Sequence, residues 1–330
     1  MPAPQLHLTF AEELSREADL ADEVRAAVRR EPRYVRLGAI FHDLPYYGNM
    51  PLMALRFTLR RAAESSEWGH RVHYDRPDLF LARFVATAGE FPGPVTRDER
   101  LALVAGLCSH AALDLSLHPL VNHIARRETE RIGGAESHHH RIAEKYHSLF
   151  YHLDARGRDV IGSREMHDKT RVTKRSSILR RATERPLVEL ALAAYRAMWG
   201  EAPTRAQWTG WVRSFAQFGV MVSGRVARRD SLKIRTAACR ARYFQCDEFD
   251  FYAFMAVARR RVVALANLAH AYFDAGDFGP DAEARLVAAL GFDGSLAEPL
   301  GVHGPRLSSA ADRKRAGTRA AAWPPARGGS

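Results

Sequence analysis

The 330-residue chain has little cysteine, little strand-like alternation and no excess of acidic residues. Its three cysteines, Cys108, Cys239 and Cys246, form no Cys-x-x-Cys pair, which argues against a disulfide framework and a zinc finger. No apolar run approaches about 18 residues, so we expect no transmembrane segment. The first residues lack a basic segment followed by an apolar one, so we expect no signal peptide and a cytoplasmic protein.

The charge of the chain is strongly positive. Lysine and arginine number 49 against 38 aspartate and glutamate, and the formal net charge is +11. Such an excess suits a polyanionic partner, namely nucleic acid, anionic lipid headgroups or a phosphate-bearing substrate. A general preference for arginine and a basic tail explain it equally well, and the basic runs RRATER, RVARRD and ARRRV are dispersed along the chain.

Apolar residues recur at helical spacing along most of the chain, which predicts an all-α, multi-helix bundle. We expect Thr9 to cap the first helix, Pro119 to kink or break a later one, and residues 36–51 to form a loop. The predicted helices are 10–30, 77–88, 98–127, 137–153, 186–199, 203–226 and 249–273.

Three regions are predicted from composition and motifs. Residues 1–160 form a metal-binding helical core. Residues 161–300 form a helical continuation of the same domain or a second helical domain. Residues 301–330 form a disordered basic tail, because their Pro, Gly, Ala and Arg content cannot bury a core.

Two motifs pair histidine with a carboxylate at the spacing of one helical turn. The first is His110, Asp114 and His118, and the second is His140 and Glu144. Residues four apart lie on the same face of a helix, so each motif points its side chains at one spot. Nine of the fifteen histidines lie between His110 and His167, more than a solvated face favours. Imidazole and carboxylate without thiolate suit zinc in a hydrolytic site.

His110 and Asp114 lie among small and apolar residues in AGLCSHAALDL. Burying both is costly unless they pair with each other or bind a metal, and the sequence leaves both outcomes open. Three earlier residues are further candidate ligands, although each is weak alone. They are His7 near the start, Asp43 in a Gly/Pro-rich segment and His73 in GHRVHYDRP.

Taken together, these motifs resemble those of the bacterial zinc-dependent phospholipase C family. The resemblance covers roughly residues 5–150 and is carried mainly by Gly-x-x-x-His-x-x-x-Asp followed by His-Pro, and by the closing His-x-x-x-Glu. It implies an all-α bundle of the zinc-dependent phospholipase C / single-strand nuclease type that holds two or three zinc ions. The implied ligands are His7, Asp43, His73, His110, Asp114, His118, His140 and Glu144.

The resemblance also implies roles for these residues. Asp114 would bridge two metals, one completed by Asp43, His73 and His110 and the other by His7. The third metal would be held by His118, His140 and Glu144, and Asp43 would also serve in catalysis as a general base. The implied activity is zinc-dependent cleavage of a phosphodiester, either a phospholipid headgroup or a nucleotide. It allows peripheral contact with an anionic membrane and requires no obligate protein partner.

Three alternatives remain open. A nuclease would use the same ligands and exploit the basic surface. In an HD-type metal phosphohydrolase, His42 and Asp43 would be paired ligands. The chain could instead be a basic helical adaptor on anionic lipid or nucleic acid, whose binding would depend on salt and survive chelation.

Overall fold

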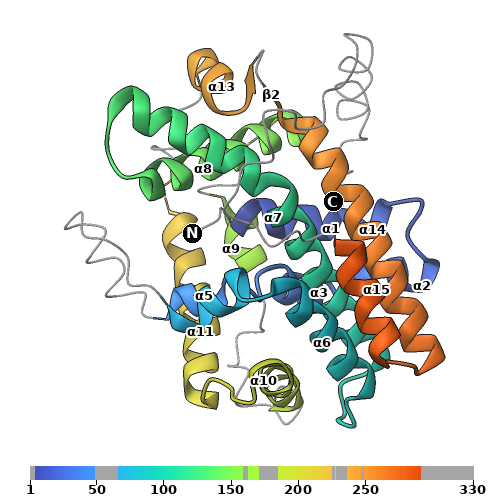
Figure 1. The fold of residues 1–330 in the computed structure, drawn as a ribbon. Coiled ribbons are helices and arrows are strands. Elements are labelled where there is room, and N and C mark those ends of the chain that lie inside the picture. The colour runs from blue at the N-terminus through green and yellow to red at the C-terminus, as the bar shows by residue number, and fades with distance from the viewer. Residues whose placement is uncertain are drawn as a thin grey trace.

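The computed structural model describes residues 4–48, 66–158, 163–170, 185–224, 227, 236–246 and 249–290. This part of the chain is almost entirely helical, which confirms the predicted all-α class (Figure 1).

The predicted tail over 301–330 lies outside the described residues. The helical elements are α1 (Pro4–Glu13), η1 (Leu14–Arg16), α2 (Asp22–Arg30), α3 (Pro32–Ala39), η2 (Leu44–Tyr47), α5 (Glu67–Tyr74), α6 (Pro77–Glu90), α7 (Arg97–Ile132), α8 (Glu136–Arg156), α9 (Arg164–Thr170), α10 (Arg185–Trp199), α11 (Arg205–Val222), α13 (Ala237–Tyr243), α14 (Phe251–Ala275) and α15 (Pro280–Leu290). Two short antiparallel strands, β1 (Gln245–Cys246) and β2 (Phe249–Asp250), precede α14.

Helix α7 is the centre of the bundle. It is 36 residues long and packs against α1, α2, α3, α6, α8 and α14 (Figure 1). It begins with a capping box, in which the Thr96 hydroxyl accepts from the Glu99 N–H and the Glu99 carboxylate accepts from the Thr96 N–H. It ends at Gly133, whose φ of 72° suits glycine.

Helix α7 is also apolar and long enough, by length and composition, to cross a membrane, which the sequence-based expectation did not anticipate. In the fold, 94% of its apolar window is buried against other helices. A helix at the centre of a soluble bundle is also apolar on most of its faces, because other helices surround it.

The predicted break at Pro119 does not occur, because α7 continues to Ile132. Proline lacks the N–H that would bond the carbonyl of Leu115, one turn earlier. Packing against the neighbouring helices maintains the rest of α7 on both sides of the proline.

The predicted single helix over residues 10–30 is wrong. The chain forms α1, which continues directly into η1, and then α2. A turn over residues 17–21 separates η1 from α2. Leu14 and Leu20 are both buried, so the apolar spacing ran across the turn and concealed it. Thr9 lies inside α1 instead of capping a helix, and its hydroxyl is 2.8 Å from His152 Nε2. The predicted loop at 36–51 is partly helical, since α3 extends to Ala39.

Helices α3 and α7 approach closely at two glycines. A Cβ atom on Gly38 would lie 2.1 Å from the Leu103 carbonyl oxygen, and one on Gly106 would lie 2.1 Å from the Val35 carbonyl oxygen. Only glycine fits such a backbone contact. The contact places the end of α3, and the turn that carries His42 and Asp43, against the face of α7 that bears the first motif.

The C-terminal helices extend the same core. Helix α14 packs along α7, and α15 packs on α6 and α14 (Figure 1). Their buried side chains belong to one hydrophobic cluster with those of α1, α3 and α6. Residues of the predicted 161–300 region therefore pack directly on the region that carries the motifs.

Candidate metal centre

The structure brings all eight predicted ligands together from five parts of the chain. Helix α1 supplies His7, the turn after α3 supplies Asp43, and α5 supplies His73. Helices α7 and α8 supply the two motifs. Three groups of side chains each place their donor atoms within 4.8 Å of one another, so each could hold a metal ion. The groups are His7, His110 and Asp114; Asp43, His73 and His110; and His118, His140 and Glu144.

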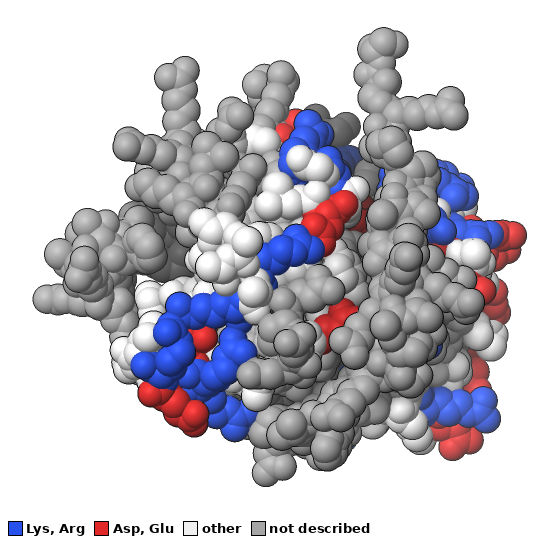
Figure 2. All heavy atoms as spheres, turned by 90° about the horizontal axis from the view of Figure 1, so that it is seen from above, with Lys and Arg blue, Asp and Glu red and all other residues white. Residues whose placement is uncertain are grey.

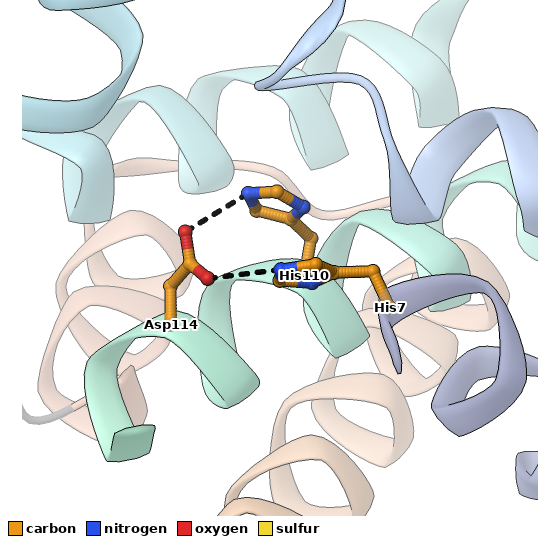
Figure 3. A group of neighbouring side chains, drawn as sticks. All are labelled: His7, His110 and Asp114. Atoms are coloured by element: carbon orange, nitrogen blue, oxygen red, sulfur yellow. Dashed lines mark ion pairs between the residues drawn. The ribbon is translucent and has the colours of Figure 1, made fainter. Parts of the chain in front are cut away.

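Asp114 lies at the junction of these groups. Its Oδ1 is 3.2 Å from His7 Nε2 and 3.6 Å from His118 Nε2. Its Oδ2 is 3.1 Å from His110 Nε2 and 3.9 Å from His73 Nε2. Figure 3 shows the imidazoles of His7 and His110 converging on this carboxylate, one ring on each oxygen. A carboxylate that faces different donors with each oxygen has the arrangement needed to bridge two ions.

Asp43 is a completely buried carboxylate that needs a cation. Its Oδ1 lies 3.3 Å from His73 Nε2, yet neither oxygen has a hydrogen-bond partner among the described residues. A buried carboxylate without hydrogen bonds is costly, and a bound metal ion would satisfy its oxygens.

Glu144 is the centre of the third group. Its Oε1 lies 3.0 Å from His140 Nε2 and 3.5 Å from His118 Nε2, and its Oε2 is buried without a hydrogen-bond partner in the described part of the chain. The side chain of His140 is 25% exposed, whereas the other ligands are almost fully buried. The third group is therefore the one nearest to solvent.

The second ring nitrogen of three histidines is fixed by a hydrogen-bond acceptor. His110 Nδ1 lies 2.8 Å from the Ala39 carbonyl, His73 Nδ1 lies 2.8 Å from the Gly69 carbonyl, and His140 Nδ1 lies 2.9 Å from Asn122 Oδ1. A carbonyl oxygen only accepts, so each Nδ1 must donate. In a neutral imidazole this leaves the Nε2 lone pair facing a carboxylate, so that either a proton or a metal ion has to lie between the two. Metal-ligating histidines commonly have this arrangement.

The electrostatics of these groups favour positive charge. Burial lowers the pKa of His110 and His118, but nearby Asp114, aided by a second carboxylate at each ring, more than offsets it and raises both to about 9. Burial raises the pKa of Asp114 and Glu144, but the surrounding imidazoles hold both below their ordinary values. Without a metal, protons therefore occupy positions that a metal would take, and metal binding has to displace them.

His138 and His139, which precede His140 and could compete with it as ligands, have other environments. His139 Nε2 lies 2.8 Å from the Gly133 carbonyl at the end of α7, and His138 is exposed. His42 is buried beside the centre, although no group of donor atoms includes it. Its ring is stacked on that of His110, with centroids 4.7 Å apart, and burial holds its pKa well below the ordinary value.

Sequence reasoning missed two features of this centre. Asn122 supports His140 from one turn beyond His118, and no motif pointed to it. His42 was considered as a partner of Asp43 in the HD-type alternative and as a competitor of Asp43 for the ligand role. Its position next to a candidate ligand was a signal, but its stacking on His110 depends on a contact between α3 and α7 that spacing does not reveal.

Charged residues line at least two cavities in the described part of the molecule. One, of about 20 Å³, borders His42, His73, His110 and Asp114. A larger one, of about 530 Å³, includes Glu12, Glu165, Arg36, Arg158 and Lys169 in its lining, none of which belongs to the metal groups. There the cations pair with the carboxylates, as Arg36 does with Glu12 at 2.6 Å and Arg158 does with Glu165 at 3.1 Å. The chemistry therefore concentrates at the small cavity.

Comparison with known proteins adds no relative: no protein-family model, no curated protein and no solved structure matches the chain significantly.

Proposed function

We propose that this chain is a zinc-dependent hydrolase that cleaves a phosphodiester, with a fold of the zinc-dependent phospholipase C / single-strand nuclease type. The observation that carries the proposal is the position of Asp114, which belongs to one donor group and also lies within 3.9 Å of His73 and His118 of the other two. The fixed Nδ1 atoms of His73, His110 and His140 support it, because they leave each Nε2 free to ligate.

Each residue has a task in this proposal. Asp43, His73 and His110 hold one ion, His7 and Asp114 the second, and His118, His140 and Glu144 the third. Bound zinc would supply a water of lowered pKa and neutralise the charge of the phosphodiester. Asp43, fully buried and without a hydrogen-bond donor among the described residues, is placed to hold a proton taken from the attacking water.

The HD-type alternative is less well supported. It requires His42 and Asp43 to ligate together, whereas the donor groups contain Asp43 without His42. The zinc-dependent nuclease alternative uses the same ligands, and the phosphodiester of a phospholipid and that of a nucleotide place the same demands on the metals.

The basic-adaptor alternative is also less well supported. On the face in Figure 2, the described Lys and Arg side chains lie beside Asp and Glu side chains. Arg71 pairs with Glu67 and Glu201, and Arg240 pairs with Asp154. Paired, dispersed arginines are typical of solvated helix faces, whereas a polyanion-binding surface gathers unpaired cations.

The test is hydrolysis of bis(4-nitrophenyl) phosphate by chelator-treated protein before and after reloading with zinc. We expect activity only after reloading, and a decrease of about 100-fold or more in Asp43→Asn. Asp78→Asn is the matched control, since Asp78 is a buried carboxylate outside the centre, paired with Arg76. Zinc-independent activity, or equal activity in the two variants, would overturn the proposal. Vesicles of phosphatidylcholine and single-stranded DNA then distinguish the two substrate sources.

A further inference from the structure

His42 is a buried imidazole beside the metal centre that the candidate donor groups do not include. It is 2% exposed, and neither ring nitrogen has a hydrogen-bond partner among the described residues. Metal binding would satisfy Asp43 and the Nε2 atoms of His73 and His110, which also lack such partners, but it would leave both nitrogens of His42 as they are. Burying an unsatisfied polar group costs about 1–3 kcal/mol, so a partner for His42 is expected.

The small cavity supplies a place for that partner. It lies where the turn after α3 meets α5, the start of α6, α7 and the end of α15. His42, His73, His110 and Asp114 border it, and apolar atoms, including those of Val72 and Leu290, form almost all of its surface. Its volume of about 20 Å³ exceeds the 10–15 Å³ or so that one water molecule needs.

The cavity borders candidate ligands of two metal groups, namely His73 and His110 of the Asp43 group and His110 and Asp114 of the His7 group. Catalytic zinc sites keep one coordination position open for water or substrate, whereas structural sites do not. Of the four polar residues around the cavity, three are candidate ligands and His42 is not. His42 is therefore the side chain left to meet whatever occupies this space.

We propose that the cavity is an open coordination position beside His73, His110 and Asp114, and that His42 is a positioning residue that hydrogen-bonds the water or phosphate oxygen occupying it. The inference rests on the proposed metal centre and deepens it. In this inference His42 does not ligate the metal, and it does more than fill space in the core.

The ring of His42 is held firmly enough for this role. It stacks on His110 at an interplanar angle of 13°, and its centroid lies 5.6 Å from that of Phe80 in an edge-to-face contact. The ring of His73 lies 5.9 Å away in a third contact. These three ring contacts fix the orientation of the His42 imidazole and therefore the directions of its hydrogen bonds. A hydrogen bond that is already oriented in this way stabilises a bound group more than a freely rotating one does.

The test uses cobalt(II) as the probe metal and inorganic phosphate as the probe ligand, with wild type, His42→Phe and His42→Gln. Phenylalanine keeps the stacking and removes both nitrogens, whereas glutamine keeps a donor and an acceptor. Cobalt per chain is measured by elemental mass spectrometry, and phosphate affinity by titration of the visible cobalt spectrum. His147→Phe is the matched control, since His147 is buried against Phe251 and does not line the cavity.

We expect His42→Phe to keep the wild-type cobalt content, to change the visible spectrum and to bind phosphate about tenfold more weakly, as the loss of one hydrogen bond predicts. His42→Gln should recover part of that affinity, and the control should match wild type. Should the phenylalanine variant not fold, His42→Leu gives the same comparison with glutamine.

Three results would overturn the inference in distinguishable ways. Loss of cobalt in His42→Phe would make His42 a ligand. Unchanged cobalt content, spectrum and phosphate affinity would make it a packing residue, and the metal centre would stand. No cobalt uptake by wild type would remove the metal centre itself, and this role with it.

Discussion

Each ligating histidine of the centre has two ring nitrogens with different environments. One faces a carboxylate, and in His73, His110 and His140 the other donates to an oxygen, which comes from the same helix for His73 and from another helix for His110 and His140. This second contact sets both the tautomer and the direction of the ring, so it controls metal affinity without touching the metal.

Asn122 tests this residue-scale argument, because its Oδ1 lies 2.9 Å from His140 Nδ1. We expect Asn122→Leu to weaken zinc binding at the third group by about 10- to 100-fold, since the His140 ring loses its acceptor. Competition with a chelating dye measures the affinity. The matched control is Asn267→Leu. Asn267 makes hydrogen bonds with the backbone of Ala21 and Asp19 and contacts none of the candidate ligands through them. Equal affinities in the two variants would contradict the role of Asn122.

At the residue scale, the sequence predicted the two spacing motifs because four-residue periodicity is a local property of helices. It could not predict that His110 would find the carbonyl of Ala39, or that His42 would stack on His110, because both contacts join separate helices. Whether the eight side chains ligate a metal stays a prediction, although the structure places their donor atoms in three groups.

At the scale of elements, the centre depends on how closely α3 lies against α7. Gly38 and Gly106 allow the two backbones to touch, and this contact places the Ala39 carbonyl 2.8 Å from His110 Nδ1. Gly106, one helical turn before His110, therefore has a packing role that also orients this candidate ligand.

We predict that Gly106→Ala will lower the free energy of unfolding by about 1–3 kcal/mol or more, because the added methyl group overlaps the Val35 carbonyl. It should also weaken zinc binding, since α3 must shift and carry Ala39 away from His110. Urea denaturation and zinc titration measure the two effects. Gly210→Ala on α11 is the control, as a Cβ there meets no atom within 4 Å, and it should be neutral or slightly stabilising. Equal effects of the two substitutions would refute this account of the packing.

The existence of most helices could be predicted, because α6, α7, α8, α10, α11 and α14 overlap the expected ranges. Their ends and breaks could not. The turn between η1 and α2 lay within an unbroken apolar pattern, and Pro119 was tolerated because the surrounding bundle maintains α7. In both cases tertiary packing outweighed the local signal.

At the scale of the whole molecule, the dependence of stability on pH follows from imidazoles that the fold buries without charge. Burial lowers the pKa of His152 from its ordinary 6.5 to about 3, although the Ser148 carbonyl opposes the shift. The unfolded chain therefore binds this proton near pH 6.5, and the folded chain binds it only near pH 3. The contribution to stability is complete above pH 6.5 and is lost as the pH falls toward 3.

We predict that protonation linked to His152 decreases the free energy of unfolding by about 2 kcal/mol when the pH is lowered from 7 to 5. Urea denaturation of metal-free wild type and His152→Gln at both pH values measures it, with the variant showing the smaller difference. Metal-free protein is used for both, so that titration of the candidate ligands is common to the pair. An identical pH dependence in the two proteins would show that His152 does not carry this effect.

The central claim, that the eight converging side chains form a zinc centre, is tested most directly by metal content. Elemental mass spectrometry is applied to wild type and Asp114→Asn, both purified without a histidine tag. We predict two or three zinc ions per chain in wild type and a sharp decrease in the variant, because Asp114 faces His7, His73, His110 and His118 at once. Less than about half a zinc ion per chain in both proteins would mean that these histidines only stabilise the fold, contradicting the claim.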